Sequence, residues 1–194
     1  MAPVNSQQFL QQLKNQVTEA RRLAESHFGG QPEATLLQQP EPGSWSAIQC
    51  LEHLNSYGRF YLPALGKAIE QAVIKGTRAN AAFRSGLVGG WFTRLMLPDA
   101  NGKPKSKMQA PKDHQPVPQL SADKVLKEFI EQQVEMESLL VAATRINLEK
   151  VKVPTSLSNF IRMSAGDTFA FLIAHMQRHL RQAERAIVAA AHPY

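Results

Sequence analysis

Cysteine is nearly absent from this chain of 194 residues, and Cys50 is the only one. A single cysteine excludes an intrachain disulfide framework. No apolar run approaches the ~18 residues that a membrane-spanning helix requires. The first residues, Met-Ala-Pro-Val-Asn-Ser-Gln-Gln, lack the basic and apolar regions of a signal peptide. We therefore expect a cytoplasmic protein with no membrane partner.

Aromatic residues are also few, at 7% of the chain, and the alternation of apolar and polar residues that marks strands is scarce. Apolar residues instead recur with the spacing of helices. With 43% hydrophobic and 20% charged residues, the chain has the composition of a globular protein rather than a disordered one. A chain of this length is usually one domain. The sequence thus predicts an all-α fold in a single domain over residues 1–194.

Acidic residues are scarce between Lys75 and Lys112, where Asp99 is the only one. This segment accounts for the net charge of the chain, which is +6. Concentrated positive charge fits either an anionic partner, such as nucleic acid, or a solvated connecting loop. We favour the loop, because the charges are not accompanied by an interleaved platform of aromatic residues for stacking on bases. The basic residues of the segment are Lys75, Arg78, Arg84, Arg94, Lys103, Lys105, Lys107 and Lys112.

Four segments show the apolar periodicity of long amphipathic helices. The expected ranges are 5–28, 47–74, 122–145 and 167–190. Ser46 and Gln49 fit a capping box at the start of the second helix, and Ser121 fits an N-cap at the start of the third. Pro63 is expected to kink or break the second helix.

Residues 76–120 form a connection far longer than usual. Within it, the apolar stretch 87–97 could form a short helix against one end of the bundle. Four helices with a long crossover between the second and the third predict a four-helix bundle of the up-up-down-down type.

Two histidines, His175 and His179, lie four residues apart in the fourth predicted helix and therefore on one of its faces. Neutral imidazoles so placed can bind one metal ion, and His53 in the second helix is the best candidate for a third ligand. Three histidines leave a coordination position open, and zinc, nickel and ferrous iron all suit imidazole. A His-x-x-x-His pair is also common on helix surfaces. Arg178 and Arg181 indicate that much of this helix is exposed. Spacing alone does not show that the two helices bring their histidines together.

Three polar residues could support such a site. Gln182 follows His175 by seven residues on the same face, where it could orient a ligand or be an ordinary surface glutamine. Tyr57 and Tyr61 follow His53 at helical spacing. They could line a pocket, although core packing is the commoner role of tyrosine at such positions.

Other residues near the histidines have less specific interpretations. Cys50 is expected to be a packing cysteine, with Trp45 placed to pack against it. His114 lies in the basic crossover and could reach over the mouth of the site, but we expect it on the surface. No carboxylate has a spacing that would make it a general base, so the sequence names no catalytic residue.

Short motifs along the chain resemble the DinB/YfiT-like superfamily. The segment Gly43-Ser-Trp45-Ser-Ala-Ile-Gln-Cys-Leu-Glu-His53-Leu is similar to the start of that family's second helix. The segment His175-Met-Gln-Arg-His179-Leu-Arg-Gln182 is similar to its His-x-x-x-His-x-x-Gln signature, and Lys-Met-Gln-Ala-Pro precedes the third helix as in family members. The resemblance implies a four-helix bundle, frequent homodimers, and a metal held by His53, His175 and His179.

The family includes thiol-dependent transferases, a few hydrolases or isomerases, and many members of unknown activity. The resemblance therefore implies a divalent metal, a small-molecule substrate and, in the transferase case, a low-molecular-weight thiol. We expect a metal-dependent transferase or hydrolase. The alternatives are a non-catalytic, dimeric binding module and, less favoured, a nucleic-acid binder that uses the basic crossover.

Overall fold

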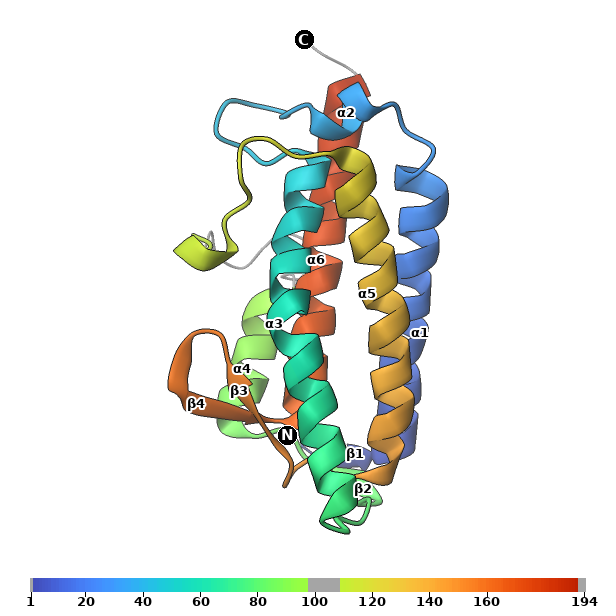
Figure 1. The fold of residues 1–194 in the computed structure, drawn as a ribbon, viewed down its shortest axis with the longest axis vertical. Helices are drawn as coiled ribbons and strands as arrows, with labels where there is room; N and C mark the ends of the chain where they lie inside the picture. Colours follow the sequence, from blue (N-terminus) through green and yellow to red (C-terminus); the bar gives the residue numbers. More distant parts are fainter. Residues whose placement is uncertain (1, 98–108, 192–194) are drawn as a thin grey trace.

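The computed structural model describes residues 2–97 and 109–191, and four long helices dominate it (Figure 1). These are α1 (Ser6–Leu23), α3 (Ala47–Ile74), α5 (Ala122–Ala142) and α6 (Ala165–Ala191). Helices α3 and α1 each pack against both α5 and α6, so the four helices form a closed bundle. Three residues of the basic crossover, Lys103, Lys105 and Lys107, lie outside the described residues, as does Asp99.

The direction of the helices differs from the expected up-up-down-down order. Figure 1 shows α1 rising, α3 and α5 both descending, and α6 rising again. The link from α1 to α3 begins and ends at the same end of the bundle, whereas residues 75–121 return the chain along its whole length. An up-up-down-down bundle needs two long crossovers, and this chain has one. The order is therefore up-down-down-up, with the crossover where the sequence predicted it.

Local capping explains where the helices begin. The Asn5 side chain accepts a hydrogen bond from the Gln8 amide at 3.0 Å, and Ser46 and Gln49 form the predicted capping box at the start of α3. Ser121 occupies the N-cap of α5 without a side-chain hydrogen bond to the helix, contrary to expectation. Helix α3 runs through Pro63 without a break.

The short elements were mostly missed by the sequence interpretation. A π-helical turn (Ala24–Phe28) extends α1, and α2 (Glu33–Leu37) interrupts the loop before α3. Strands β3 (Lys152–Thr155) and β4 (Ser158–Ser164) form an antiparallel hairpin before α6, and β1 (Val4–Asn5) pairs with β2 (Ala82–Phe83). The fold is therefore mainly, but not purely, helical.

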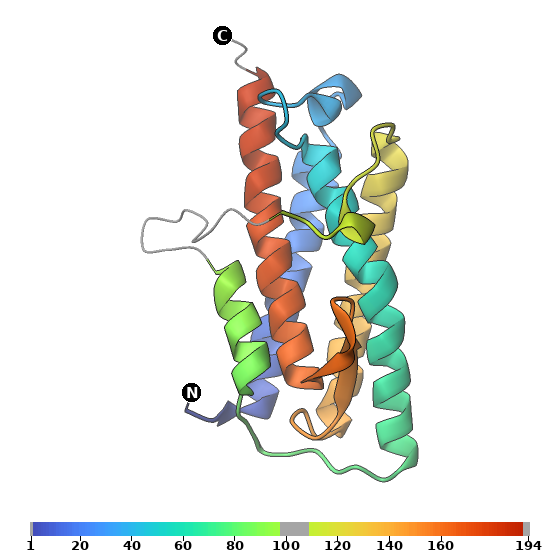
Figure 2. The ribbon, with the colours of Figure 1, turned by 90° about the vertical axis from the view of Figure 1, so that its left-hand side faces the viewer.

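Helix α4 (Leu87–Met96) confirms the short helix expected in the crossover, but not its position. It packs along the first half of α6 rather than against an end of the bundle (Figure 2). The Phe92 and Phe171 ring centroids lie 5.9 Å apart in this contact. Helix α4 thereby forms one side of the space next to the histidines of α6.

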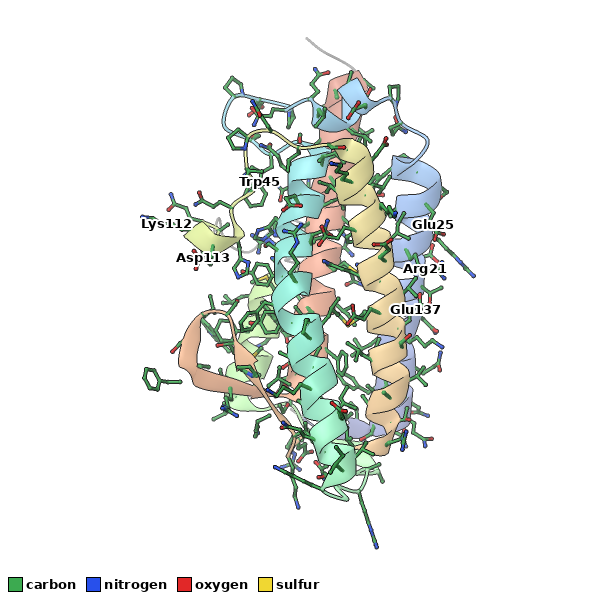
Figure 3. All side chains as sticks on the ribbon, viewed as in Figure 1. Arg21, Glu25, Trp45, Lys112, Asp113 and Glu137 are labelled. Carbon is green, nitrogen blue, oxygen red and sulfur yellow. The ribbon has the colours of Figure 1, made fainter. Side chains whose placement is uncertain are left out.

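Charged residues tie the helices together at the surface. Arg21 of α1 bonds Glu137 of α5 through Nε at 3.1 Å and Glu25 through Nη1 at 3.0 Å, as the side chains labelled in Figure 3 show. The interior is apolar and includes Cys50, whose burial raises the thiol pKa to about 12. Cys50 is thus a packing cysteine, as predicted. No helix among the described residues has both the length and the apolar character to cross a membrane.

Candidate metal centre

The fold brings His53 of α3 together with His175 and His179 of α6. One candidate ligand nitrogen from each ring lies within 4.8 Å of the other two. The closest pair, His53 Nε2 and His175 Nε2, is 3.1 Å apart. All three side chains are buried, with exposed fractions of 3%, 4% and 9% in sequence order. The question that spacing left open is answered, because the two helix faces meet at the histidines.

Hydrogen bonds at the outer nitrogens fix the orientation of two of the rings. His53 Nδ1 lies 2.6 Å from the carbonyl oxygen of His114, and His179 Nδ1 lies 3.1 Å from Gln182 Oε1. A carbonyl oxygen only accepts hydrogen bonds, so each Nδ1 carries the proton and donates it. The Nε2 atoms of His53 and His179 therefore keep their lone pairs. Metal-binding histidines in proteins are commonly oriented in this way, with the ring nitrogen that does not bind the metal donating to an oxygen acceptor.

The rings are held neutral by burial. Desolvation lowers the pKa of His53 to about 4 and that of His179 to about 3, and it lowers the pKa of His175 well below its ordinary value. The positive charge of Arg178 lowers the pKa of His175 and His179 further. Metal ions bind the neutral form of imidazole, so at neutral pH the three side chains are already in the ligand state.

These residues fit a divalent metal ion. Two ligand nitrogens that each lie ~2.0–2.1 Å from a tetrahedral zinc are separated by about 3.3 Å, close to the spacing of the His53–His175 pair. His175 Nδ1 is buried and has no hydrogen-bond partner among the described residues, so its ring is held by packing and by the contact of its Nε2 with His53 Nε2. It stacks on Phe171, with an interplanar angle of 5°.

A cavity of about 450 Å³ opens onto the histidines. The size is typical of small-molecule sites. Tyr57 lines it, which was the less favoured of its two expected roles, and Tyr61 does not. The Tyr61 hydroxyl instead accepts a hydrogen bond from the Ser156 amide at 3.0 Å and supports the β3–β4 hairpin. The other lining residues are Gly43, Ser44, Trp45, His53, Met96, Gln109, Ala110, Pro111, His175, Arg178, His179, Gln182 and Arg185.

Trp45, predicted to pack near Cys50, lies beside the rings of two of the histidines. Its ring centroid is 4.9 Å from that of His53 and 5.8 Å from that of His179. The indole belongs to the loop before α3 and points toward the bundle (Figure 3). Trp45 therefore closes one side of the site and limits access of water to the ligands.

His114 is the main residue that the sequence interpretation missed. It was expected on the surface, but it is 6% exposed and its ring stacks on Tyr57 at a centroid distance of 3.9 Å. Its Nδ1 lies 2.9 Å from Ser56 Oγ, while its backbone carbonyl binds His53. The crossover thus contacts a candidate ligand through His114, in addition to lining the cavity through Met96, Gln109, Ala110 and Pro111. No spacing rule indicates this, because His114 lies 61 residues from His53 along the chain.

Gln182 provides a direct test of ligand orientation. We expect Gln182→Leu to weaken metal affinity 10–100-fold, because the acceptor that holds His179 Nδ1 is lost. Chelator competition with the tag-free protein measures the change. Gln182→Glu keeps an acceptor at the same place and should retain affinity within a few-fold. Equal losses in both variants would contradict the orienting role.

The lowered pKa values predict acid sensitivity of the metal-free protein. An unfolded histidine titrates near 6.5, whereas folded His53 and His179 titrate near 4 and 3. Between these values the unfolded state binds more protons, so stability falls as the pH drops below about 6.5. Each histidine contributes a slope of up to ~1.4 kcal/mol per pH unit. Urea unfolding of chelator-treated protein at pH 7 and 5 measures this. The slope should be unchanged in His27→Ala, since His27 is exposed, and equal stability at both pH values would contradict the prediction.

Taken together, the fold and the site define a class: four-helix-bundle proteins with a three-histidine candidate metal centre between two of the helices. The family model of the DinB superfamily matches residues 16–183. The match covers most of the chain, so the protein belongs to the DinB superfamily, as the sequence motifs indicated. Searches of curated proteins and of solved structures returned no match.

Proposed function

We propose that this protein is a metal-dependent enzyme that acts on a small molecule, with a divalent ion held by His53, His175 and His179. Transfer of a group to or from a low-molecular-weight thiol is the favoured reaction, and hydrolysis is the alternative at the same site. One observation carries the proposal. Three neutral imidazoles converge at a cavity of small-molecule size, and the outer nitrogens of two are fixed by hydrogen bonds.

The side chains around the cavity have separate roles in the proposed reaction. When bound, a divalent ion supplies a Lewis acid that favours the deprotonated form of a thiol or of water at neutral pH. His114 and Gln182 keep His53 and His179 in the ligand orientation. Trp45 and Tyr57 form apolar walls, and burial raises the pKa of the Tyr57 hydroxyl to about 12, so it stays protonated as a hydrogen-bond donor.

No described residue that lines the cavity is an aspartate or a glutamate. Within the described part of the chain, the lining therefore offers no carboxylate as a general base. A thiol suits such a site better than water does, because its pKa is far lower and less base is needed to ionise it. This is the reason for placing thiol transfer before hydrolysis.

Cobalt(II) offers a test that does not require the natural substrate. We expect the cobalt-loaded protein to develop a thiolate-to-cobalt absorption band on titration with 2-mercaptoethanol. The band should be lost in His53→Ala and retained in His27→Ala, which removes an exposed histidine. Bound cobalt whose spectrum does not respond to the thiol would overturn the transferase proposal and favour hydrolysis. Failure to bind cobalt at all would overturn both.

A further inference from the structure

Two arginines of α6 lie beside the candidate metal centre. Arg178 and Arg185 both line the cavity, and no acidic side chain among the described residues lines it with them. Arg178 was expected on the outer surface of its helix, but it is half-buried. The cavity therefore combines three neutral histidines with two permanent positive charges.

Helix geometry places the two guanidinium groups on one side of the cavity. Seven residues separate Arg178 from Arg185, so they lie on the same face of α6, about 10 Å apart along its axis. Gln182 lies between them on that face and also lines the cavity. Arg178 and Arg185 thus form a row that leads away from the histidines toward the C-terminal end of α6.

Helix α4 holds Arg178, the arginine of this row that lies beside the histidines, in place. Arg178 Nη1 donates a hydrogen bond to the carbonyl oxygen of Leu95, in the last turn of α4, at 3.2 Å. Met96, the next residue, lines the cavity. Figure 2 shows α4 lying along α6 where this contact forms. Arg178 directly precedes His179 in α6 and lines the same cavity as His175 and His179. Arg178 is therefore held in place close to the candidate ligands.

We propose that Arg178 and Arg185 form an anion subsite that selects elongated small molecules with a carboxylate at one end and the reacting group at the metal centre. The proposal deepens the proposed function and rests on it for the metal-bound end of the ligand. A planar guanidinium matches a carboxylate through two parallel hydrogen bonds, which makes arginine the suitable residue here. Hydrogen bonds to charged groups contribute more than neutral ones, so a carboxylate should tighten binding about 10-fold or more.

A pair of thiols that differ only in charge tests the subsite. We titrate the cobalt-loaded protein with 6-mercaptohexanoate and with 6-mercaptohexanol, and follow the thiolate-to-cobalt band. The carboxylate is expected to bind at least 10-fold more tightly than the alcohol at low salt. Arg185→Gln should reduce that ratio to about 2-fold or less, while the affinity for the alcohol stays the same. Arg185 is exposed, so its replacement spares the core.

The control is Arg181→Gln, which removes the same charge from an exposed position of α6 that does not line the cavity. It should keep the full preference for the carboxylate. Arg178→Lys should keep part of it, since the charge remains but the planar donor pair is lost. An equal loss of preference in Arg181→Gln would show a general charge effect and overturn the subsite. A wild-type ratio near one would also overturn it, even where both thiols bind cobalt.

A second readout separates the subsite from the metal. Trp45 lines the cavity, and in a Trp91→Phe background it is the only tryptophan. Its fluorescence in metal-free protein should respond to hexanoate at lower concentration than to hexanol, with the difference lost in Arg185→Gln. If cobalt does not bind but this difference is present, the proposed function fails while the anion subsite stands. If the difference is absent in both readouts, the subsite is wrong.

Discussion

Replacing His175 with alanine is expected to reduce bound metal from about one equivalent to less than ~0.2 equivalents. The ring centroid of His175 lies 4.9 Å from that of His53 and 4.6 Å from that of His179, and the His53 and His179 centroids are themselves 4.6 Å apart, so all three rings contact one another. Without it two imidazoles remain, fewer than the three protein ligands of a catalytic zinc site. Metal analysis of protein purified without a polyhistidine tag measures the loss, and His53→Ala should give the same result.

Two controls separate ligand loss from unfolding. His175→Phe keeps a ring that can stack on Phe171 but removes both nitrogens, so the fold should survive while the metal is lost. His27→Ala removes an exposed histidine and should keep full occupancy. The metal-centre proposal would be wrong if wild-type protein held less than ~0.2 equivalents after incubation with excess zinc, or if His175→Phe retained about one.

The long helices could be predicted from the sequence because their signals are local. The second predicted helix, 47–74, coincides with α3 because Ser46 and Gln49 supply a complete capping box three residues apart. The pairing of His175 with His179 is equally local, since one helical turn sets it. His53 was predicted as the third ligand from its place on the second predicted helix, but only the packed bundle shows that α3 and α6 turn these faces toward each other.

The features that escaped prediction depend on contacts between distant parts of the chain. His114 became a site residue through its carbonyl bond to His53 and its stacking on Tyr57, which the crossover alone does not encode. Arg178 was expected on the surface of its helix. It is half-buried because α4 packs along α6, where the Leu95 carbonyl accepts a hydrogen bond from Arg178. The order of helix directions was likewise set by where the crossover ends, not by the helices themselves.

The contact between α4 and α6 depends on a glycine, and we expect Gly89→Ala to destabilise the protein by about 2 kcal/mol. A Cβ atom at Gly89 would lie 2.3 Å from Asp167 Cβ, far inside contact distance, so the helices must move apart. Asp167 cannot easily give way. It is 2% exposed and binds the Gly86 amide at 3.0 Å and Ser164 Oγ at 2.7 Å. Urea unfolding measures the loss.

Gly66→Ala is the matched control, because Gly66 also lies inside a helix but its added Cβ would meet only Leu139 Cδ2 at 3.7 Å. Alanine favours a helix over glycine by ~1 kcal/mol, so this variant should be neutral or stabilised. The two substitutions are expected to change the stability in opposite directions, which separates the effect of the α4–α6 contact from that of helix propensity.

Because α4 carries the Leu95 carbonyl that holds Arg178, Gly89→Ala should also weaken the preference for 6-mercaptohexanoate while metal occupancy is retained. Unchanged stability in Gly89→Ala would mean that α4 packs less tightly on α6 than the Gly89–Asp167 approach requires.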